Sequence, residues 1–179
     1  MKLNSLLGNT IRIAAKSGTD ISFILSDGMT IPFTTHEPGA NAYLPPAEIS
    51  YDIASESANG VIVVDVTIGE LRVNTDLIHS FGIVDEPVSL NIENGNIVEF
   101  FGGKMAERLK FEFSKLPVNS RKIVEFGVGL SQMKPSGIIG IDEGIIGTCH
   151  FGFGSGNNND APIHFDVVVN DFIVECYNV

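Results

Sequence analysis

The chain has 179 residues, 44% of them hydrophobic and 18% charged, a composition typical of one globular domain covering residues 1–179. Its formal net charge of −11 argues against nucleic acid or an anionic membrane as a partner, because phosphate groups need a positive surface. No apolar run approaches the ~20 residues that span a bilayer, and no signal peptide is recognisable at the start. Two isolated cysteines match no metal or redox motif, so we expect a cytoplasmic protein.

The first third of the chain carries strand patterns separated by turn residues. Alternating or continuous apolar residues predict strands at 10–15, 21–25 and 29–33, and a mostly buried strand at 60–67. Two prolines stand shortly before Glu48 and favour an extended backbone there. Glu48 is therefore expected to be fixed in place rather than carried on a mobile loop.

A hairpin and a helix are predicted in the middle of the chain. The dipeptide Asn94-Gly95 is a strong signal for a type I′ turn between strands at 87–93 and 96–101. Apolar residues at helical spacing then predict one main helix at 104–116, which Pro117 ends.

The last third is again rich in strand patterns. A glycine-rich passage at 137–147 is expected to be partly strand and carries Asp142 and Glu143, which either orient a metal ligand or form a plain turn. A polar loop is expected at 155–160, and His36 and His79 are expected in solvated loops. Strands are predicted at residues 121–127, 148–154, 161–169 and 172–177.

These elements predict a strand-rich single domain of the α+β class. Its mixed or antiparallel sheet is expected to be barrel-like, with the one main helix near 104–116 packed against it. So many strands leave sheet edges to protect, and we therefore expect a homodimer or a larger homo-oligomer.

The strand at 161–169 contains an anomaly. His164 and Asp166 are two residues apart, so they share one face of a strand that is otherwise apolar. A buried charge without a partner costs several kcal/mol (roughly), so a compensating group is expected. A metal ion is one candidate, and a simple hydrogen-bonded His–Asp pair on a half-exposed strand is the other.

Three further residues of ligand type lie in apolar, proline-rich or glycine-rich surroundings. Three carboxylates and two imidazoles are the ligand count of a dinuclear metal site with one bridging carboxylate. Two imidazoles with one carboxylate are the count of a mononuclear facial triad. The candidate metal ligands are Glu48, Glu125, His150, His164 and Asp166.

The same positions carry a family resemblance. Residues 43–48 resemble the pattern Asn-Leu-Pro-x-Gly-Glu, and residues 124–129 resemble Glu-Leu-Gly-Ile-Gly. Residues 142–154 resemble Asp-Glu…Gly-Thr-x-His-x-x-x-Gly, and residues 163–166 resemble Ile-His-x-Asp. With residues 18–21, these motifs resemble, in order, the C-terminal metal-binding region of the aminopeptidase T family of thermophilic, leucyl aminopeptidase-like metallopeptidases.

This resemblance implies a metal-dependent aminopeptidase, a hydrolase with a dinuclear Zn or Co site in which Glu48 and Glu125 take part in catalysis and Glu125 bridges the metals. Two such ions would activate a water and polarise the carbonyl of a peptide or other small-molecule substrate. The sequence departs from the family in three ways. It does not include the family's large N-terminal domain, it has Tyr43 and Ala47 where the pattern has Asn and Gly, and it has Asn157 where a catalytic Tyr is expected.

Two alternatives follow from the same residues. Distant relatives of the family include ring-cleaving dihydroxypyridine dioxygenases, so a mononuclear non-haem Fe(II) dioxygenase-like protein with His150, His164 and Asp166 as ligands is the first. A non-catalytic metal-binding remnant of the peptidase family is the second.

Overall fold

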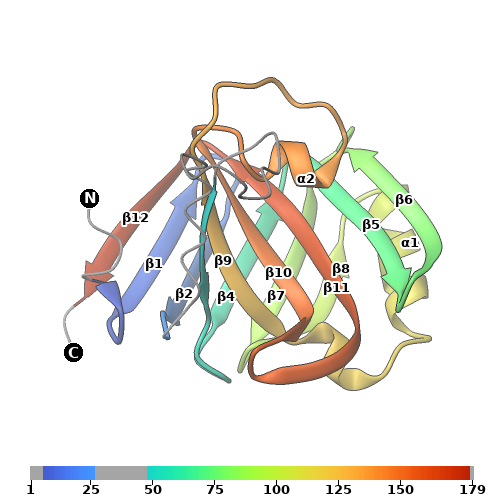
Figure 1. Ribbon diagram of the computed structural model, residues 1–179, viewed down its shortest axis with the longest axis horizontal. Helices are drawn as coiled ribbons and strands as arrows, with labels where there is room; N and C mark the ends of the chain where they lie inside the picture. The colour runs from blue at the N-terminus through green and yellow to red at the C-terminus, as the bar shows by residue number, and fades with distance from the viewer. Residues whose placement is uncertain (1–5, 27–47, 178–179) are drawn as a thin grey trace, which may run out of the picture.

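Antiparallel strands account for most of the structure, a computed structural model that describes residues 6–26 and 48–177 (Figure 1). The strand expected at 29–33 and the residue His36 lie outside the described residues. The first of two six-stranded sheets has the order β12-β1-β2-β4-β7-β8. Its strands are β1 (Thr10–Ala15), β2 (Asp20–Ile24), β4 (Asn59–Val64), β7 (Val88–Glu93), β8 (Asn96–Phe101) and β12 (Phe172–Tyr177).

The second sheet has the order β3-β9-β10-β11-β5-β6. Its strands are β3 (Glu48–Asp52), β5 (Thr67–Val73), β6 (Asp76–Ile83), β9 (Ile123–Gly129), β10 (Thr148–Gly156) and β11 (Asn159–Asn170). The helical elements of the described residues are α1 (Lys104–Phe113), a 3₁₀ turn η2 (Val118–Arg121) and the one-turn helix α2 (Ile139–Asp142).

The two sheets pack face to face over an aromatic core. The ring of Phe23 on β2 lies 5.3 Å from that of Phe126 on β9 and 6.1 Å from that of Phe151 on β10. Helix α1 covers one end of this core, where Phe113 contacts Phe100 of β8 and Phe165 of β11. Because these side chains are nearly or fully buried, each strand of the second sheet turns its alternate residues to the opposite, outer face.

The predicted α+β class is wrong, and so is the barrel-like sheet. In the described residues the sheets stay separate, both are antiparallel, and the strands far outweigh the helices, so the fold is mostly β. The one helix predicted at 104–116 is not enough to make the fold α+β. Helix α1 ends at Phe113, and it caps the core instead of forming a layer over a sheet.

Local predictions differ in their outcome. The type I′ turn at Asn94-Gly95 is confirmed, since both residues have positive φ and join β7 to β8. The hairpin of β5 and β6 was missed, and His79 lies on β6 instead of in a loop. The loop expected at 155–160 is a tight hairpin, and the strand expected within 137–147 is replaced by α2.

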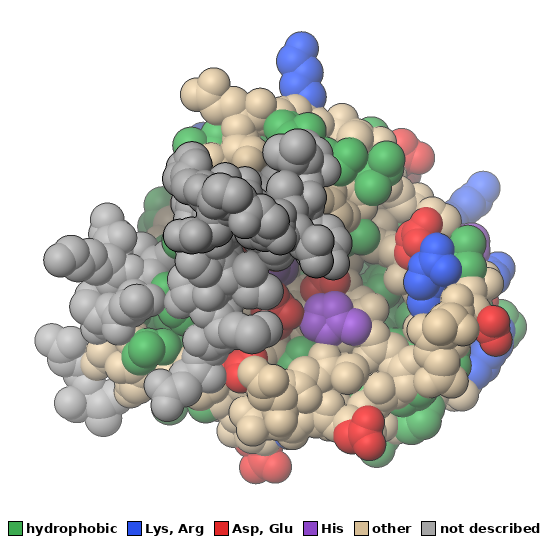
Figure 2. Space-filling model, viewed as in Figure 1, with side chains coloured by type: hydrophobic (Ala, Val, Ile, Leu, Met, Phe, Trp, Pro, Cys, Tyr) green, Lys and Arg blue, Asp and Glu red, His purple; other side chains and the backbone are tan. Residues whose placement is uncertain are grey.

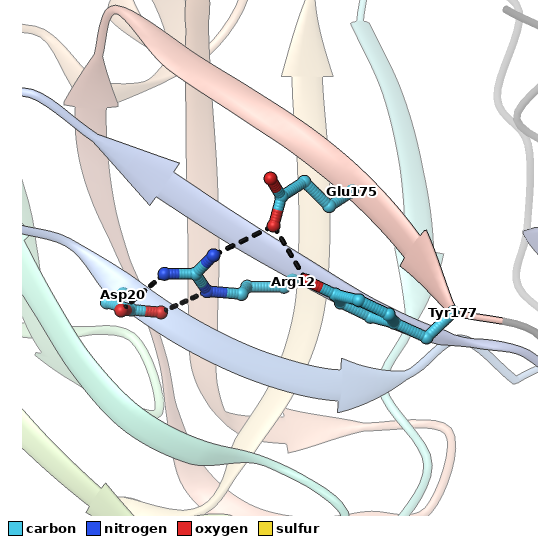
Figure 3. A network of polar contacts seen from close by, with 4 residues as sticks. All are labelled: Arg12, Asp20, Glu175 and Tyr177. Atoms are coloured by element: carbon cyan, nitrogen blue, oxygen red, sulfur yellow. Dashed lines mark hydrogen bonds and ion pairs between the residues drawn. The ribbon is translucent and has the colours of Figure 1, made fainter.

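An ion-pair network, here called the Arg12 cluster, ties together three strands of the first sheet (Figure 3). The Arg12 guanidinium donates two hydrogen bonds of 2.7 Å to Asp20 on β2 and one of 2.8 Å to Glu175 on β12. The Tyr177 hydroxyl donates a further bond of 2.8 Å to the same Glu175 oxygen. The cluster therefore joins β2, β1 and β12 across their hydrogen-bonded ladders.

No helix in the part of the chain that the structure describes is long and apolar enough to cross a membrane. The homodimer or larger oligomer expected from the sequence stays a prediction.

Candidate metal centre

The candidate site lies on the outer face of the second sheet. Along β10, Cys149, Phe151 and Phe153 point into the core, so the intervening His150 points to the outer face. The same alternation brings Glu125 of β9 to that face. Alternation along β3 and β11 also places Glu48, His164 and Asp166 on the outer face. Figure 2, in the view of Figure 1, shows a histidine side chain with acidic side chains beside it near the middle of this face.

Two glycines make room for these side chains. Gly127 lies directly opposite His150, and a Cβ on Gly127 would stand only 2.0 Å from Cε1 of that imidazole ring. Gly152 lies opposite both Glu125 and Asp166, and a Cβ there would come within 2.9 Å of each of those side chains. Across β9, β10 and β11, each of these ionisable side chains thus has a glycine as its neighbour on the adjacent strand. The space above the glycines lets the ionisable groups approach one another on the outer face.

The five ligand candidates form one continuous cluster, here called the His–carboxylate cluster. His150 Nδ1 lies 3.8 Å from Glu48 Oε2, and His150 Nε2 lies 3.6 Å from Glu125 Oε1. His164 Nε2 lies 3.4 Å from Glu125 Oε2 and 3.2 Å from Asp166 Oδ1. The two imidazoles thus alternate with the three carboxylates, and Glu125 lies between the two rings.

Glu143 also belongs to this cluster, although the sequence pattern did not indicate it as a ligand. It follows α2, in the segment that crosses the outer face of the sheet, where Ile139 packs on Gly69 of β5. Six ligand-type residues thus form two groups of three, within each of which the ligand atoms lie within 4.8 Å of one another. The groups are Glu48, Glu143 and His150, and Glu125, His164 and Asp166.

Asp142 holds this crossing segment in place. Its buried carboxylate accepts bonds of 2.8 Å from the backbone N–H groups of Ser136 and Gly137 and from the Ser136 hydroxyl, and it also accepts one from Thr67 of β5. Asp142 is therefore anchored to the sheet, and its neighbour Glu143 reaches the cluster because of that anchor. The Asp-Glu pair was visible in the sequence, but its position depends on a loop conformation that no periodicity encodes.

The cluster shifts the protonation of its members in opposite directions. Burial lowers the pKa of His150, but the hydrogen bond to Glu125 and the charges of Glu48, Glu143 and Asp166 outweigh it and raise that pKa to about 9. Burial raises the pKa of Glu143 to about 8 despite the opposing charge of His150. Burial also raises that of Glu48, whereas His150 and Ser50 more than offset burial at Glu125 and lower its pKa to about 2.

The donor set fits a divalent metal ion. Among the described residues, two of its buried atoms have no hydrogen-bond partner, namely Glu48 Oε2 and His150 Nδ1. His164 Nδ1 lies 2.7 Å from the carbonyl oxygen of Ser155, which can only accept, so Nδ1 carries the proton. In the neutral ring this leaves the lone pair of Nε2 directed at Glu125 and Asp166, the orientation that metal-ligating histidines usually have. A divalent metal is therefore plausible here.

Among solved structures the chain is similar to 2,5-dihydroxypyridine dioxygenase from Pseudomonas putida KT2440, with 19% sequence identity and a TM-score of 0.73. The match covers 97% of this chain and 53% of the dioxygenase, so the chain spans about half the length of that structure. No protein-family model matches the sequence, and no curated protein matches it. At this identity the likeness shows the fold.

The resemblance to the aminopeptidase T family is thus wrong, and with it the interpretation as a zinc or cobalt aminopeptidase hydrolase. The matched motifs are short strings of glycine, histidine and acidic residues. Any sheet that places ligands on adjacent strands beside small residues produces such strings. Such motifs indicate that ionisable side chains cluster on one face of a sheet, and they do not identify the reaction that takes place there.

Proposed function

We propose that the chain is a mononuclear non-haem iron protein of the ring-cleaving dioxygenase type. The two imidazoles, His150 and His164, with Asp166 would hold Fe(II), and Glu125 would lie beside the ion. Two histidines and one carboxylate are the ligands that non-haem Fe(II) oxygenases use. The observation that carries the proposal is the cluster itself, in which two imidazoles alternate with carboxylates at 3.2–3.8 Å. Buried His150 Nδ1 also has no hydrogen-bond partner among the described residues.

Fe(II) is favoured over Zn or Co by the two-histidine donor set and by the structural similarity to a dioxygenase. When bound, iron supplies the redox chemistry that lets O2 react with an organic substrate. The cleavage of a ring by a dioxygenase places both oxygen atoms in the product and needs no external reductant. One O2 should therefore be consumed for each ring that is opened.

The substrate we propose is a single dihydroxylated aromatic ring. The structural neighbour is named for 2,5-dihydroxypyridine, a ring of this kind. A cavity of about 220 Å³ adjoins Glu125 and His164, and it is smaller than the ~300–1,000 Å³ that drug-sized ligands occupy. One ring with its hydroxyl groups suits this volume.

The test is metal loading without oxygen, followed by oxygen uptake. The purified chain is reconstituted anaerobically with Fe(II), Zn(II) or Co(II), its metal content is measured, and O2 consumption with 2,5-dihydroxypyridine is recorded. We expect one iron per chain and one O2 per ring. The variant His164→Ala should lose both metal and oxygen uptake, whereas His79→Ala on β6 provides the matched control and should keep both.

Two outcomes would overturn this proposal. Retention of two zinc ions per chain with no oxygen uptake in the iron form would contradict both the mononuclear site and the dioxygenase class. Tight binding of a single metal without oxygen uptake for any dihydroxylated ring would leave a non-catalytic metal-binding protein.

A further inference from the structure

The cavity beside the cluster has a second polar wall that the metal centre does not use. This wall is formed by Asp52 at the end of β3 and by Asn157 in the turn between β10 and β11. Asn157 Nδ2 donates a hydrogen bond of 2.7 Å to Asp52 Oδ2. Glu125 and the proposed iron ligand His164 line the same cavity, so the pair and the proposed metal centre share one space.

A carboxylate at position 52 is unfavourable for the stability of the sheet. Asp52 shares the outer face of β3 with Glu48 and Ser50, and its direct cross-strand neighbour is Glu125. Two like charges directly opposite each other destabilise a sheet. His150 and Ser50 hydrogen-bond Glu125, whereas Asp52 accepts its hydrogen bond from the neutral amide of Asn157.

The turn that carries Asn157 is rigidly linked to the metal ligand on β11. Ser155 of the same hairpin accepts the hydrogen bond of His164 Nδ1, and Asn159 donates bonds to the carbonyl groups of Gly154 and Asn119. The distance between the Asp52–Asn157 pair and the His164 ring is therefore set by one short hairpin. A ring bound beside His164 therefore lies in the same cavity as this pair.

We propose that the Asp52–Asn157 pair determines substrate specificity by accepting a hydrogen bond from a hydroxyl or ring N–H of the substrate. The inference rests on the proposed function, because it places the substrate between this pair and the iron. The Asp52 carboxylate has a second oxygen, Oδ1, beside the one that Asn157 occupies. A ring with a carboxylate substituent would meet Asp52, Glu125 and Asp166, and in a chain of net charge −11 it would be repelled. The chain therefore selects rings without a carboxylate.

Ring binding without oxygen tests this specificity independently of turnover. The dissociation constants of 2,5-dihydroxypyridine and of its carboxylated counterpart 2,5-dihydroxypyridine-3-carboxylate are measured anaerobically, with Fe(II) and with redox-inert Zn(II) in the site. We expect the wild-type chain to bind the uncharged ring about 100-fold more tightly. Asp52→Asn should weaken its binding about 10-fold or more and bring the preference between the two rings below about 10-fold, because a charged acceptor and its repulsion are both lost.

Two further variants keep the test independent of folding. Asp171→Asn makes the same substitution on an exposed turn that contacts Lys16, and it should leave both dissociation constants unchanged. Asn157→Ala removes only the group that holds Asp52, and it should weaken binding of the uncharged ring about 3-fold to 10-fold with unchanged metal content.

Equal binding of the two rings by the wild-type chain would overturn the inference, as would wild-type selectivity in both Asp52→Asn and Asn157→Ala. Either result would leave the iron site intact, because metal content and oxygen uptake are measured separately. Loss of metal from the wild-type chain would instead contradict the proposed function.

Discussion

Two ionic clusters of similar size lie on the two sheets, and they are built in opposite ways. In the Arg12 cluster of the first sheet, a guanidinium meets two carboxylates through hydrogen bonds of 2.7–2.8 Å on a half-exposed surface. In the His–carboxylate cluster of the second sheet, the separations between ring nitrogens and carboxylate oxygens are 3.2–3.8 Å. The second cluster is also more deeply buried, with a His150 side chain that is only 2% exposed.

The difference shows which cluster has its charges balanced without a bound metal ion. The Arg12 cluster has a permanent cation, and each contact in it is a short hydrogen bond, so it needs nothing further to hold three strands together. Among the described residues, the ion pairs of the other cluster include no Lys and no Arg. Its buried atoms without partners are ligand atoms, and a divalent cation would satisfy several of them at once.

The largest expected effect comes from removing one charge from each cluster. Asp166→Asn should weaken binding of Fe(II) or Zn(II) by more than about 100-fold, whereas Asp20→Asn in the Arg12 cluster should leave metal affinity unchanged. At a metal concentration of ~100 times the wild-type dissociation constant, the wild-type chain gains about 2.7 kcal/mol in unfolding free energy and a 100-fold weaker variant only about 0.4 kcal/mol. Thermal unfolding with and without metal measures this gain. Equal gains in the two variants would mean that Asp166 is not a ligand.

The next effect concerns the space that the His–carboxylate cluster needs. In Gly127→Ala the new methyl group would overlap the His150 ring, whose Cε1 atom would lie 2.0 Å from it, so the ring must move. We expect a loss of about 1–3 kcal/mol in unfolding free energy together with weaker metal binding. Gly140→Ala is the control, because only Glu143 Oε1 comes within 4 Å of the new atom, at 3.9 Å. Urea unfolding of both variants compares them.

The pH dependence of the metal-free chain should separate the clusters further. The pKa of His150 in the folded chain is about 9, above its ordinary 6.5, so its contribution to stability is complete below pH 6.5 and is lost as the pH rises through about 9. Glu143, with a folded pKa of about 8 against 4.5, acts in the same direction from pH 4.5 to about 8. The unfolding free energy should therefore fall by on the order of several kcal/mol between about pH 5 and 9.

Metal should reverse this trend, because its ligands bind only when deprotonated and its affinity rises with pH. Unfolding in the presence of a chelator and in the presence of Zn(II), at the same series of pH values, tests both statements. Parallel curves with and without metal would contradict them. His150→Gln should flatten the metal-free curve.

The strands that carry the candidate ligands could be predicted from the sequence, whereas the segment that places Glu143 beside them could not. Glu125, His164 and Asp166 are ionisable residues in strands whose apolar neighbours indicate burial. Ionisable side chains are unexpected there, and the sequence alone shows them. Glu143 was missed as a ligand because its position depends on the contacts of Asp142 with Ser136, Gly137 and Thr67, which are distant from any periodic pattern.

The errors at the level of the fold have related causes. Strand β6 is an edge strand of the second sheet and pairs with β5. It exposes Leu77, Ile78 and Ile83, so its apolar residues do not alternate as those of a half-buried strand do. The four residues of α2 are too few to show a helical period. The motif resemblance failed because ligand residues beside glycines recur wherever ions or charges gather, whatever reaction follows.

The smallest expected effect is the stability change in the Arg12 cluster. The hydrogen bond from Arg12 lowers the pKa of Asp20, so the stabilisation is complete above pH 3.8 and is lost as the pH falls through the lower folded value. Because the pair is exposed, Asp20→Asn should lower the melting temperature by about 3 °C or less at neutral pH. The difference from the wild-type chain should shrink in about 1 M salt and again at low pH, since screening and protonation remove the same interaction. A difference that persists under both conditions would mean that the Asp20 side chain stabilises the sheet by packing, and the Arg12 cluster would then not be the electrostatic counterpart of the His–carboxylate cluster.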